Sequence, residues 1–141
     1  MKKLTVLFIS IFSILSAKSQ TVNVTVTVSN VSSNEGIVQV CVFDKADAFP
    51  QKTKLAVKCV TANATKGTMK IQVDGLAPGS YALAVHHDKN NDGKFNTNFF
   101  GIPTEASGAT KGAKGKMGPP KYSDAVLVID KKETQVAITI Q

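Results

Sequence analysis

The amino-acid sequence predicts an all-β protein, a seven-stranded antiparallel β-sandwich that carries one long ordered loop. Two observations predict this fold class. Short segments in which apolar and polar residues alternate recur along the chain, and turn-forming residues separate them. After residue 19, no segment repeats its apolar residues with the period of a helix. A chain of 141 residues has room for one such domain rather than two.

The predicted strands follow one another at short intervals. In residues 22–28, valine at every second position alternates with asparagine or threonine, which is typical of a strand with one wet face. Residues 37–43 are apolar at almost every position, so this strand is expected to be buried on both faces. The other five strands are predicted at residues 55–59, 69–73, 81–85, 125–129 and 136–140.

The first 19 residues have the three-part layout of a secretory signal peptide. Two lysines precede an apolar run over residues 4–15, and small residues precede the expected cleavage site between Ser19 and Gln20. The alternative is a membrane anchor, but a helix of about 12 residues rises only about 18 Å, less than the roughly 30 Å hydrocarbon layer. We therefore expect a signal peptide at 1–19, a single domain at 20–141, and a secreted or periplasmic protein without a membrane span.

The basic residues argue against one class of partner, nucleic acid, and the two cysteines of the mature chain suggest a disulfide. Three of the 17 basic residues lie in the signal peptide, so 14 basic residues face 10 acidic ones in the mature chain, a net charge of +4. Every basic residue is lysine, and without arginine there is no bidentate recognition of phosphate or guanine, which argues against specific nucleic-acid binding. An exported compartment favours a disulfide between Cys41 and Cys59. The alternative is two buried thiols on neighbouring strands.

Residues 88–124 interrupt the strand pattern and form the predicted long loop. They contain six of the chain's ten glycines. A connection of this length in a compact domain is usually either functional or disordered. Aromatic residues argue for order, because a disordered linker carries few of them. The aromatic residues of the loop are Phe95, Phe99, Phe100 and Tyr122.

The start of this loop has oxygen-bearing side chains at the spacing of a calcium-binding loop. Asp88, Asn90 and Asp92 occupy every second position, and Gly93 at the sixth allows the sharp turn that aims such ligands inward. Phe99 stands where an EF-hand needs a glutamate, so the pattern predicts a looser, weak calcium site on a β scaffold. The further candidate ligands are the Lys94 carbonyl, Asn96, Asn98 and Glu105. The alternative is a plain turn in which the Asx side chains accept hydrogen bonds from local amides.

The same region resembles a known bacterial family. Its motifs are His87-Asp88-x-Asn90-x-Asp92-Gly93-Lys94, Asn98-x-x-Gly101-Ile102-Pro103-x-Glu105-x-x-Gly108 and Gly118-Pro119-Pro120-x-Tyr122-x-x-Ala125, preceded by Gly75-Leu76-x-Pro78-Gly79-x-Tyr81-Ala82. Their spacing is similar to that of the bacterial domain-of-unknown-function family 2141. The resemblance implies an exported bacterial protein with an immunoglobulin-like or transthyretin-like β-sandwich, and it implies no particular activity. It also marks structural positions, namely Gly101, Pro103, Gly118, Pro119 and Pro120.

The sequence favours an exported, non-enzymatic binding or structural module whose long loop is braced by weakly bound calcium. The alternative is a module that binds carbohydrate or the cell envelope through the four loop aromatic residues, although such residues also commonly pack against one another. The expected partner is a cell-envelope polysaccharide or protein. Hydrolysis by His87 and Glu105 as an acid–base pair is the least favoured hypothesis, because no nucleophile is marked by its neighbours. His87 is expected instead to be structural, with a ring nitrogen that holds the backbone of the loop.

Overall fold

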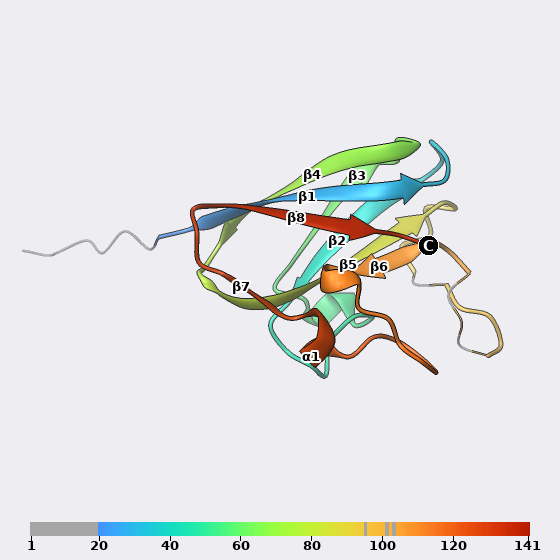
Figure 1. Cartoon of the computed structure of the whole chain (residues 1–141). Helices are drawn as coiled ribbons and strands as arrows, with labels where there is room; N and C mark the ends of the chain where they lie inside the picture. The colour runs from blue at the N-terminus through green and yellow to red at the C-terminus, as the bar shows by residue number, and fades with distance from the viewer. Residues whose placement is uncertain (1–19, 95, 101, 103) are drawn as a thin grey trace, which may run out of the picture.

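The computed structural model describes residues 20–94, 96–100, 102 and 104–141. In this part of the chain, strands form two facing sheets, so the predicted β-sandwich is confirmed, with eight strands instead of seven (Figure 1). The strands are β1 (Val22–Val31), β2 (Ile37–Phe43), β3 (Lys58–Asn63), β4 (Gly67–Leu76), β5 (Gly79–Asp88), β6 (Ser107–Ala109), β7 (Leu127–Ile129) and β8 (Glu133–Thr139). The helical elements described are the 3₁₀ turns η1 (Thr53–Leu55) and η2 (Thr110–Gly112) and the short helix α1 (Tyr122–Ala125).

The first sheet has the order β4-β1-β8, with β1 in the centre. β1 is antiparallel to β4 but parallel to β8, so the expectation of a wholly antiparallel sandwich is wrong at this edge. The reason is the path of the chain. β8 follows a crossing from β7, which pairs with the second sheet, and so it is free of the antiparallel direction that a hairpin imposes. Its register places Val136 beside Val26 and Ile138 beside Val28, so the apolar side chains of both strands face the same side.

The second sheet has the order β3-β2-β5, and the far edge of β5 is shared by two short strands. β7 pairs with β5 near its start, at Gly79–Tyr81, and β6 pairs with it further along, at Ala84–His86. Ser107 and Gln141 exchange main-chain hydrogen bonds of 3.1 Å, which join β6 to the end of the chain beyond β8. The two sheets are therefore linked at the edge from which the long loop emerges.

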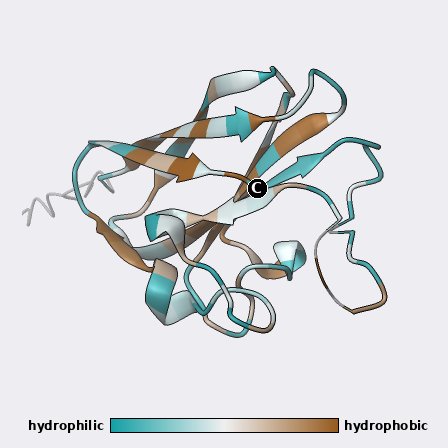
Figure 2. Ribbon diagram, turned by 45° about the vertical axis from the view of Figure 1, so that its right-hand side comes forward, coloured by the Kyte–Doolittle hydropathy of each residue, from teal (hydrophilic) through white to brown (hydrophobic). Residues whose placement is uncertain are grey.

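The main core lies between the two sheets. The alternating valines of β1 face this core and are fully buried, as the period-two pattern predicts. The second sheet contributes Leu83 and Val85 from β5 and the alternate valines of β2. Figure 2 shows the resulting alternation of apolar and polar residues along the strands.

A second, smaller apolar cluster covers the outer face of the second sheet. Phe43 of β2 packs edge-to-face on Phe49, with ring centroids 5.6 Å apart, and Phe49 packs in the same way on Tyr122, at 6.0 Å. Cys41 and Ala82 lie in the same cluster. β2 is therefore buried on both faces, as its continuous apolar sequence predicts, because the connection that follows it folds back over the sheet.

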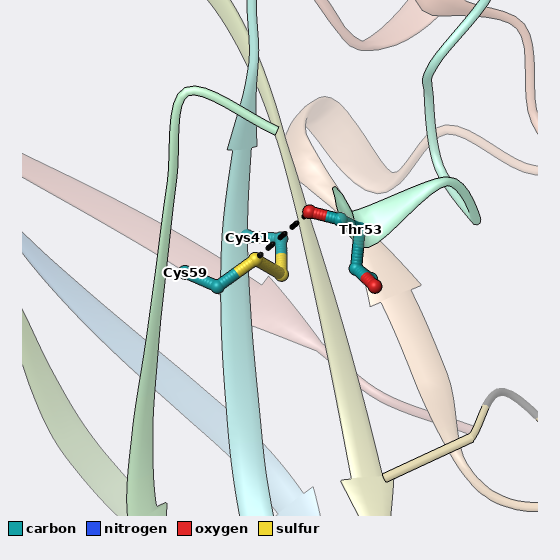
Figure 3. Close-up of a disulfide and its surroundings, with 3 residues drawn as sticks. All are labelled: Cys41, Thr53 and Cys59. Atoms are coloured by element: carbon teal, nitrogen blue, oxygen red, sulfur yellow. Dashed lines mark hydrogen bonds between the residues drawn. A yellow bond between two sulfur atoms is a disulfide. The ribbon is translucent and has the colours of Figure 1, made fainter. Parts of the chain in front are cut away.

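The disulfide between Cys41 and Cys59 is present, so the alternative of two buried thiols is wrong (Figure 3). The two residues stand directly opposite each other on β2 and β3, with their Cα atoms 4.1 Å apart. The Cys59 sulfur also lies 3.8 Å from the Thr53 carbonyl oxygen of η1. The bridge thus joins the edge strand β3 to the buried strand β2 beside the turn that precedes β3.

Two predicted strands begin later than expected because their first residues make local hydrogen bonds. The Leu55 N–H donates to the Lys52 carbonyl in a 3₁₀ turn, and β3 starts only at Lys58. Leu55 is 57% exposed rather than part of a half-buried strand. The Val126 N–H donates to the Tyr122 carbonyl at the end of α1, so β7 starts at Leu127.

The predicted long loop, residues 88–124, contains short elements of its own. β6, η2 and α1 all fall within it. Thr110 is buried and donates its hydroxyl to the Ala125 carbonyl at 2.6 Å, while the Leu83 N–H donates to the same hydroxyl at 3.1 Å. This one side chain therefore ties the middle of the region to β5 and to α1.

Across residues 20–94, 96–100, 102 and 104–141, no helix has the length and apolar character needed to cross a bilayer. The predicted signal peptide, residues 1–19, lies outside this part of the chain, as do Phe95, Gly101 and Pro103.

Candidate functional site

The end of β5 places two adjacent histidines on opposite faces of the sheet. His87 is fully buried on the core side, and its Nε2 lies 2.9 Å from the Glu35 carbonyl oxygen. Because a carbonyl oxygen only accepts, Nε2 carries the proton, and Nδ1 has no hydrogen-bond partner among the described residues. The ring therefore holds the connection between β1 and β2 rather than the long loop. It is the main chain of His87 that reaches the loop, through an N–H that donates to the Ala106 carbonyl at 2.9 Å.

Glu105 closes the base of the loop from the other side. Its Oε2 lies 3.0 Å from His86 Nε2, and its Oε1 accepts a hydrogen bond of 2.9 Å from the Lys89 N–H. The side chains of His86 and Glu105 are 11% and 10% exposed. Burial raises the pKa of the Glu105 carboxyl, but the donors from Lys89, His86 and Asn96 outweigh it and hold the pKa below its ordinary value.

The oxygen-rich segment after β5 forms a tight turn that its own side chains stabilise. Asp88 is buried, and its carboxylate accepts hydrogen bonds from the Asp92 N–H at 3.2 Å and the Gly93 N–H at 2.8 Å. The Asn90 side chain also accepts a hydrogen bond from the Asp92 N–H, at 3.1 Å. Gly93 has φ +71°, the left-handed conformation for which the sequence pattern requires glycine.

Asn96 joins this turn to Glu105. Its Nδ2 donates to Asp92 Oδ2 at 3.1 Å and to Glu105 Oε2 at 3.2 Å. Asp92 also accepts a hydrogen bond from the Lys94 N–H at 2.8 Å, and this bond, followed by the one from Asn96, lowers the pKa of its carboxyl. We call Asp88, Asn90, Asp92, Asn96 and Glu105 the loop network.

The loop network contains most of the predicted calcium ligands but departs from a metal site in its geometry. Among the residues that the structure describes, no group of three or more His, Cys, Asp or Glu side chains is arranged to hold a metal ion. Asn98 lies apart from the network, because its Oδ1 accepts hydrogen bonds from the Phe100 and Ile102 N–H groups, at 2.9 and 3.0 Å. In this arrangement the oxygen-rich side chains bond local amides, as in the alternative that the sequence left open.

The predicted aromatic residues separate into two environments. Phe99 and Phe100 are 97% and 81% exposed and contact each other edge-to-face, with ring centroids 5.5 Å apart. Tyr122 instead packs on Phe49, and its hydroxyl donates to the Ser80 carbonyl at 3.2 Å. Burial, with smaller contributions from Asp44 and Tyr81, raises the Tyr122 pKa. We call Asn98, Phe99, Phe100 and Ile102 the aromatic tip.

A groove of about 630 Å³ lies beside the aromatic tip and was not predicted from the sequence. Phe100 and Ile102 line one part of it, and the segment 112–120 lines another. This segment lies within residues 111–121, which we call the lysine segment. Its Gly115 allows a close turn, since a Cβ there would lie 1.8 Å from the Gly118 carbonyl oxygen. Gly118, Pro119 and Pro120, which were expected to be structural positions, also line the groove and so form part of its surface.

A family model of uncharacterized proteins conserved in bacteria, DUF2141, matches residues 26–137. The chain belongs to this family. The match confirms the resemblance of the loop motifs to this family. It extends from β1 to β8, so the loop network and most of the groove lining lie within the DUF2141 region, while Thr139 and Gln141 of the groove lie beyond it. The chain matches no curated protein and no solved structure.

In this DUF2141 chain, the two residues considered as an acid–base pair do not contact each other through their side chains. Glu105 contacts His86, while the neighbouring His87 points to the core side of β5 and bonds Glu35. The sequence pattern favoured His87 because this residue follows the alternation of the buried β5 residues. Glu105 lies 18 positions after His87 and 19 positions after His86. The path by which the loop returns to the sheet decides which of these two histidines contacts Glu105.

Proposed function

We propose that this protein is an exported, non-enzymatic binding module that contacts the bacterial cell envelope through its aromatic tip. The observation that carries the proposal is the 97% and 81% exposure of Phe99 and Phe100. Large apolar side chains that protrude from a loop are typical of contact sites, since binding removes their surface from water. Export, which the N-terminal pattern predicts, would bring this surface to the envelope.

The loop network supports the proposal because it gives the tip a defined base. Asn96 of the loop network, two residues before Asn98, donates hydrogen bonds to Asp92 and Glu105. Within the tip, the Asn98 side chain accepts hydrogen bonds from the Phe100 and Ile102 N–H groups. A preorganised loop loses less conformational entropy when it binds than a mobile one. The His87 ring bonds Glu35 rather than Glu105, which removes the support for hydrolysis by His87 and Glu105 as an acid–base pair.

Co-sedimentation of the purified protein with isolated bacterial envelope fragments tests this function. The fragments contain both glycan and lipid, so the assay asks whether the tip contacts the envelope at all. Phe99→Ala/Phe100→Ala should lower the apparent affinity, measured by titration with fragments, at least about tenfold, because each phenylalanine side chain contributes about 1.5–3 kcal/mol when fully buried. Val128→Ala is the matched control, because Val128 is 68% exposed on β7. Equal binding by both variants and the wild type would refute the proposal.

The proposal includes calcium as a weak brace of the loop. Its support is the oxygen-rich spacing after β5 and the membership of three carboxylates, those of Asp88, Asp92 and Glu105, in the loop network. Asn96 donates amide hydrogens toward two of these groups, so its side-chain amide would have to rotate to present oxygen to a cation. A site that must rearrange in this way would be weak, with a dissociation constant on the order of 10⁻³ M.

Thermal unfolding in chelator and in about 10 mM calcium tests the brace, since a ligand that binds the folded state stabilises it by mass action. We expect an upward shift of the melting temperature for the wild type. Asp92→Asn should abolish the shift, because it removes a charge while keeping an oxygen acceptor. Asp130→Asn, an exposed site in the turn between β7 and β8, should retain it. Identical melting curves with and without calcium would remove calcium from the proposed function.

A further inference from the structure

We propose that the envelope component bound by this protein is an anionic lipid surface, on which the aromatic tip and the lysine segment dock together. This inference rests on the proposed function and names its partner. Figure 1 draws the aromatic tip and the lysine segment on the side of the molecule away from the start of β1.

The two segments form one surface because they line the same groove. Phe100 and Ile102 of the aromatic tip share its lining with Lys114, Lys116 and Met117 of the lysine segment. Met117 is 101% exposed and Ile102 58%. The aromatic tip therefore presents Phe99, Phe100 and Ile102, and the lysine segment presents Met117. Two neighbouring segments thus each carry exposed apolar groups that project from the domain. Apolar groups at the ends of projections can enter the boundary between lipid headgroups and acyl chains without the rest of the domain doing so.

The charge around the groove complements an anionic surface. Residues 94–121 contain lysines at 94, 111, 114, 116 and 121 and a single acidic residue, Glu105. The Glu105 carboxylate is 10% exposed and is engaged by His86, Lys89 and Asn96, so it is turned away from an approaching partner. Lys111, Lys114, Lys116 and Lys121 are exposed. Exposed lysines beside apolar anchors attract anionic headgroups, and each contributes about fivefold in affinity at moderate salt.

The kind of apolar side chain favours lipid over polysaccharide. A sugar ring stacks on the flat face of an aromatic residue, but Phe99 and Phe100 stand at 86° to each other, so they do not form one flat platform. Ile102 and Met117 offer no ring, although both are exposed and Met117 is as exposed as the phenylalanines. Tyr122, a third ring of the predicted sugar-binding set, is held against Phe49. Aliphatic and aromatic groups without a shared plane suit acyl chains, which make no demand on ring orientation.

Sedimentation with vesicles tests this partner. The protein is mixed with vesicles of phosphatidylglycerol and phosphatidylethanolamine, with vesicles of phosphatidylcholine alone, and with purified peptidoglycan. We expect binding to the anionic vesicles at about 0.1 M salt and a marked loss at about 1 M, where the Debye length falls from about 10 Å to about 3 Å. Lys114→Gln/Lys116→Gln should weaken binding by about 25-fold. Lys131→Gln/Lys132→Gln, in the turn between β7 and β8, should leave it unchanged.

A tryptophan reporter separates insertion from simple attraction. The chain contains no tryptophan, so Phe99→Trp places a single tryptophan at the aromatic tip, and its emission can be excited selectively at wavelengths where tyrosine does not absorb. Its emission should shift to shorter wavelength with anionic vesicles, because insertion moves the indole out of water. The matched variant Val128→Trp should show no shift. Far-UV circular dichroism of every variant checks that the sandwich is folded.

The outcomes distinguish this inference from the proposed function. Binding to envelope fragments and peptidoglycan but not to anionic vesicles would overturn the lipid surface and leave the envelope-binding module in place, with glycan as partner. Equal binding to neutral and anionic vesicles, or an unshifted Phe99→Trp spectrum in bound protein, would also overturn it. Failure to bind envelope fragments as well as vesicles would overturn both proposals.

Discussion

Glu105 shows how a single side chain determines the shape of the long loop. Its carboxylate meets a histidine ring from β5, a main-chain N–H from the residue after β5, and a side-chain amide from the middle of the loop. Three donors that come from different parts of the chain converge on one group. Loss of this group would therefore release both ends of the segment that carries the aromatic tip.

The lowered pKa of Glu105 predicts how its contribution to stability changes with pH. The unfolded chain binds a proton on this carboxyl at higher pH than the folded chain does, so the contribution is present above about pH 4.5 and is lost as the pH falls through the lower, folded-state pKa. We expect the melting temperature to fall on acidification below about pH 4.5, and to fall less steeply in Glu105→Gln. Glu133→Gln, at an exposed position of β8, serves as control and should retain the wild-type slope. Indistinguishable acid profiles for Glu105→Gln and the wild type would contradict this role.

At the scale of an element, β2 shows why a continuous apolar sequence correctly predicts a strand that is buried on both faces. Val38, Val40 and Val42 face the main core, while Cys41 and Phe43 face the outer cluster. Both faces need a cover, and the connection through Phe49 together with α1 supplies the second one. The edge strand β3 has less apolar surface to bury, and the disulfide attaches it to β2 at Cys41.

Removal of the disulfide should destabilise the fold without changing its topology. The bridge closes a loop with a sequence separation of 18, which corresponds to about 3 kcal/mol in the chain-entropy treatment. Cys41→Ala/Cys59→Ala should lower the free energy of unfolding in urea by about this amount. A reducing agent should destabilise the wild type similarly and leave the double variant unaffected. A variant as stable as the oxidised wild type would show that the bridge contributes little.

At the scale of the whole molecule, the sandwich acts as a support that places the aromatic tip and the lysine segment at one edge. β6 is anchored both to β5 and to the end of the chain near β8, so the loop before it and the lysine segment after it leave the fold at neighbouring points. The main core lies between the two sheets, and Leu83 of β5 is fully buried in it.

Leu83→Ala should therefore lower the stability of the whole domain. Truncation of a buried leucine removes apolar contacts and leaves a cavity, which together cost about 2–5 kcal/mol. The free energy of unfolding in urea measures the loss, and Val128→Ala at its exposed position should stay within about 0.5 kcal/mol of the wild type. A loss below about 1 kcal/mol for Leu83→Ala would mean that the two sheets are less tightly packed than the structure indicates.

Local sequence determined the β-sandwich, the buried character of β2, the two cysteines available for a bridge, and the tight turn that follows Asp88. Each of these depends on side-chain period or on residues close in the chain, such as Asp88 and Gly93, whose contact spans five positions. Tertiary structure alone decided the parallel pairing of β8, the choice of His86 over His87 as the partner of Glu105, and the placement of Phe100 in one groove with Lys114 and Lys116, 14 and 16 positions away. The physical reason is that the spacing of apolar residues along a segment indicates which of its faces is apolar, but not which distant segment packs against that face. The hydrogen bond between Asn23 and Glu133 crosses 110 positions, and nothing local to either residue specifies the other.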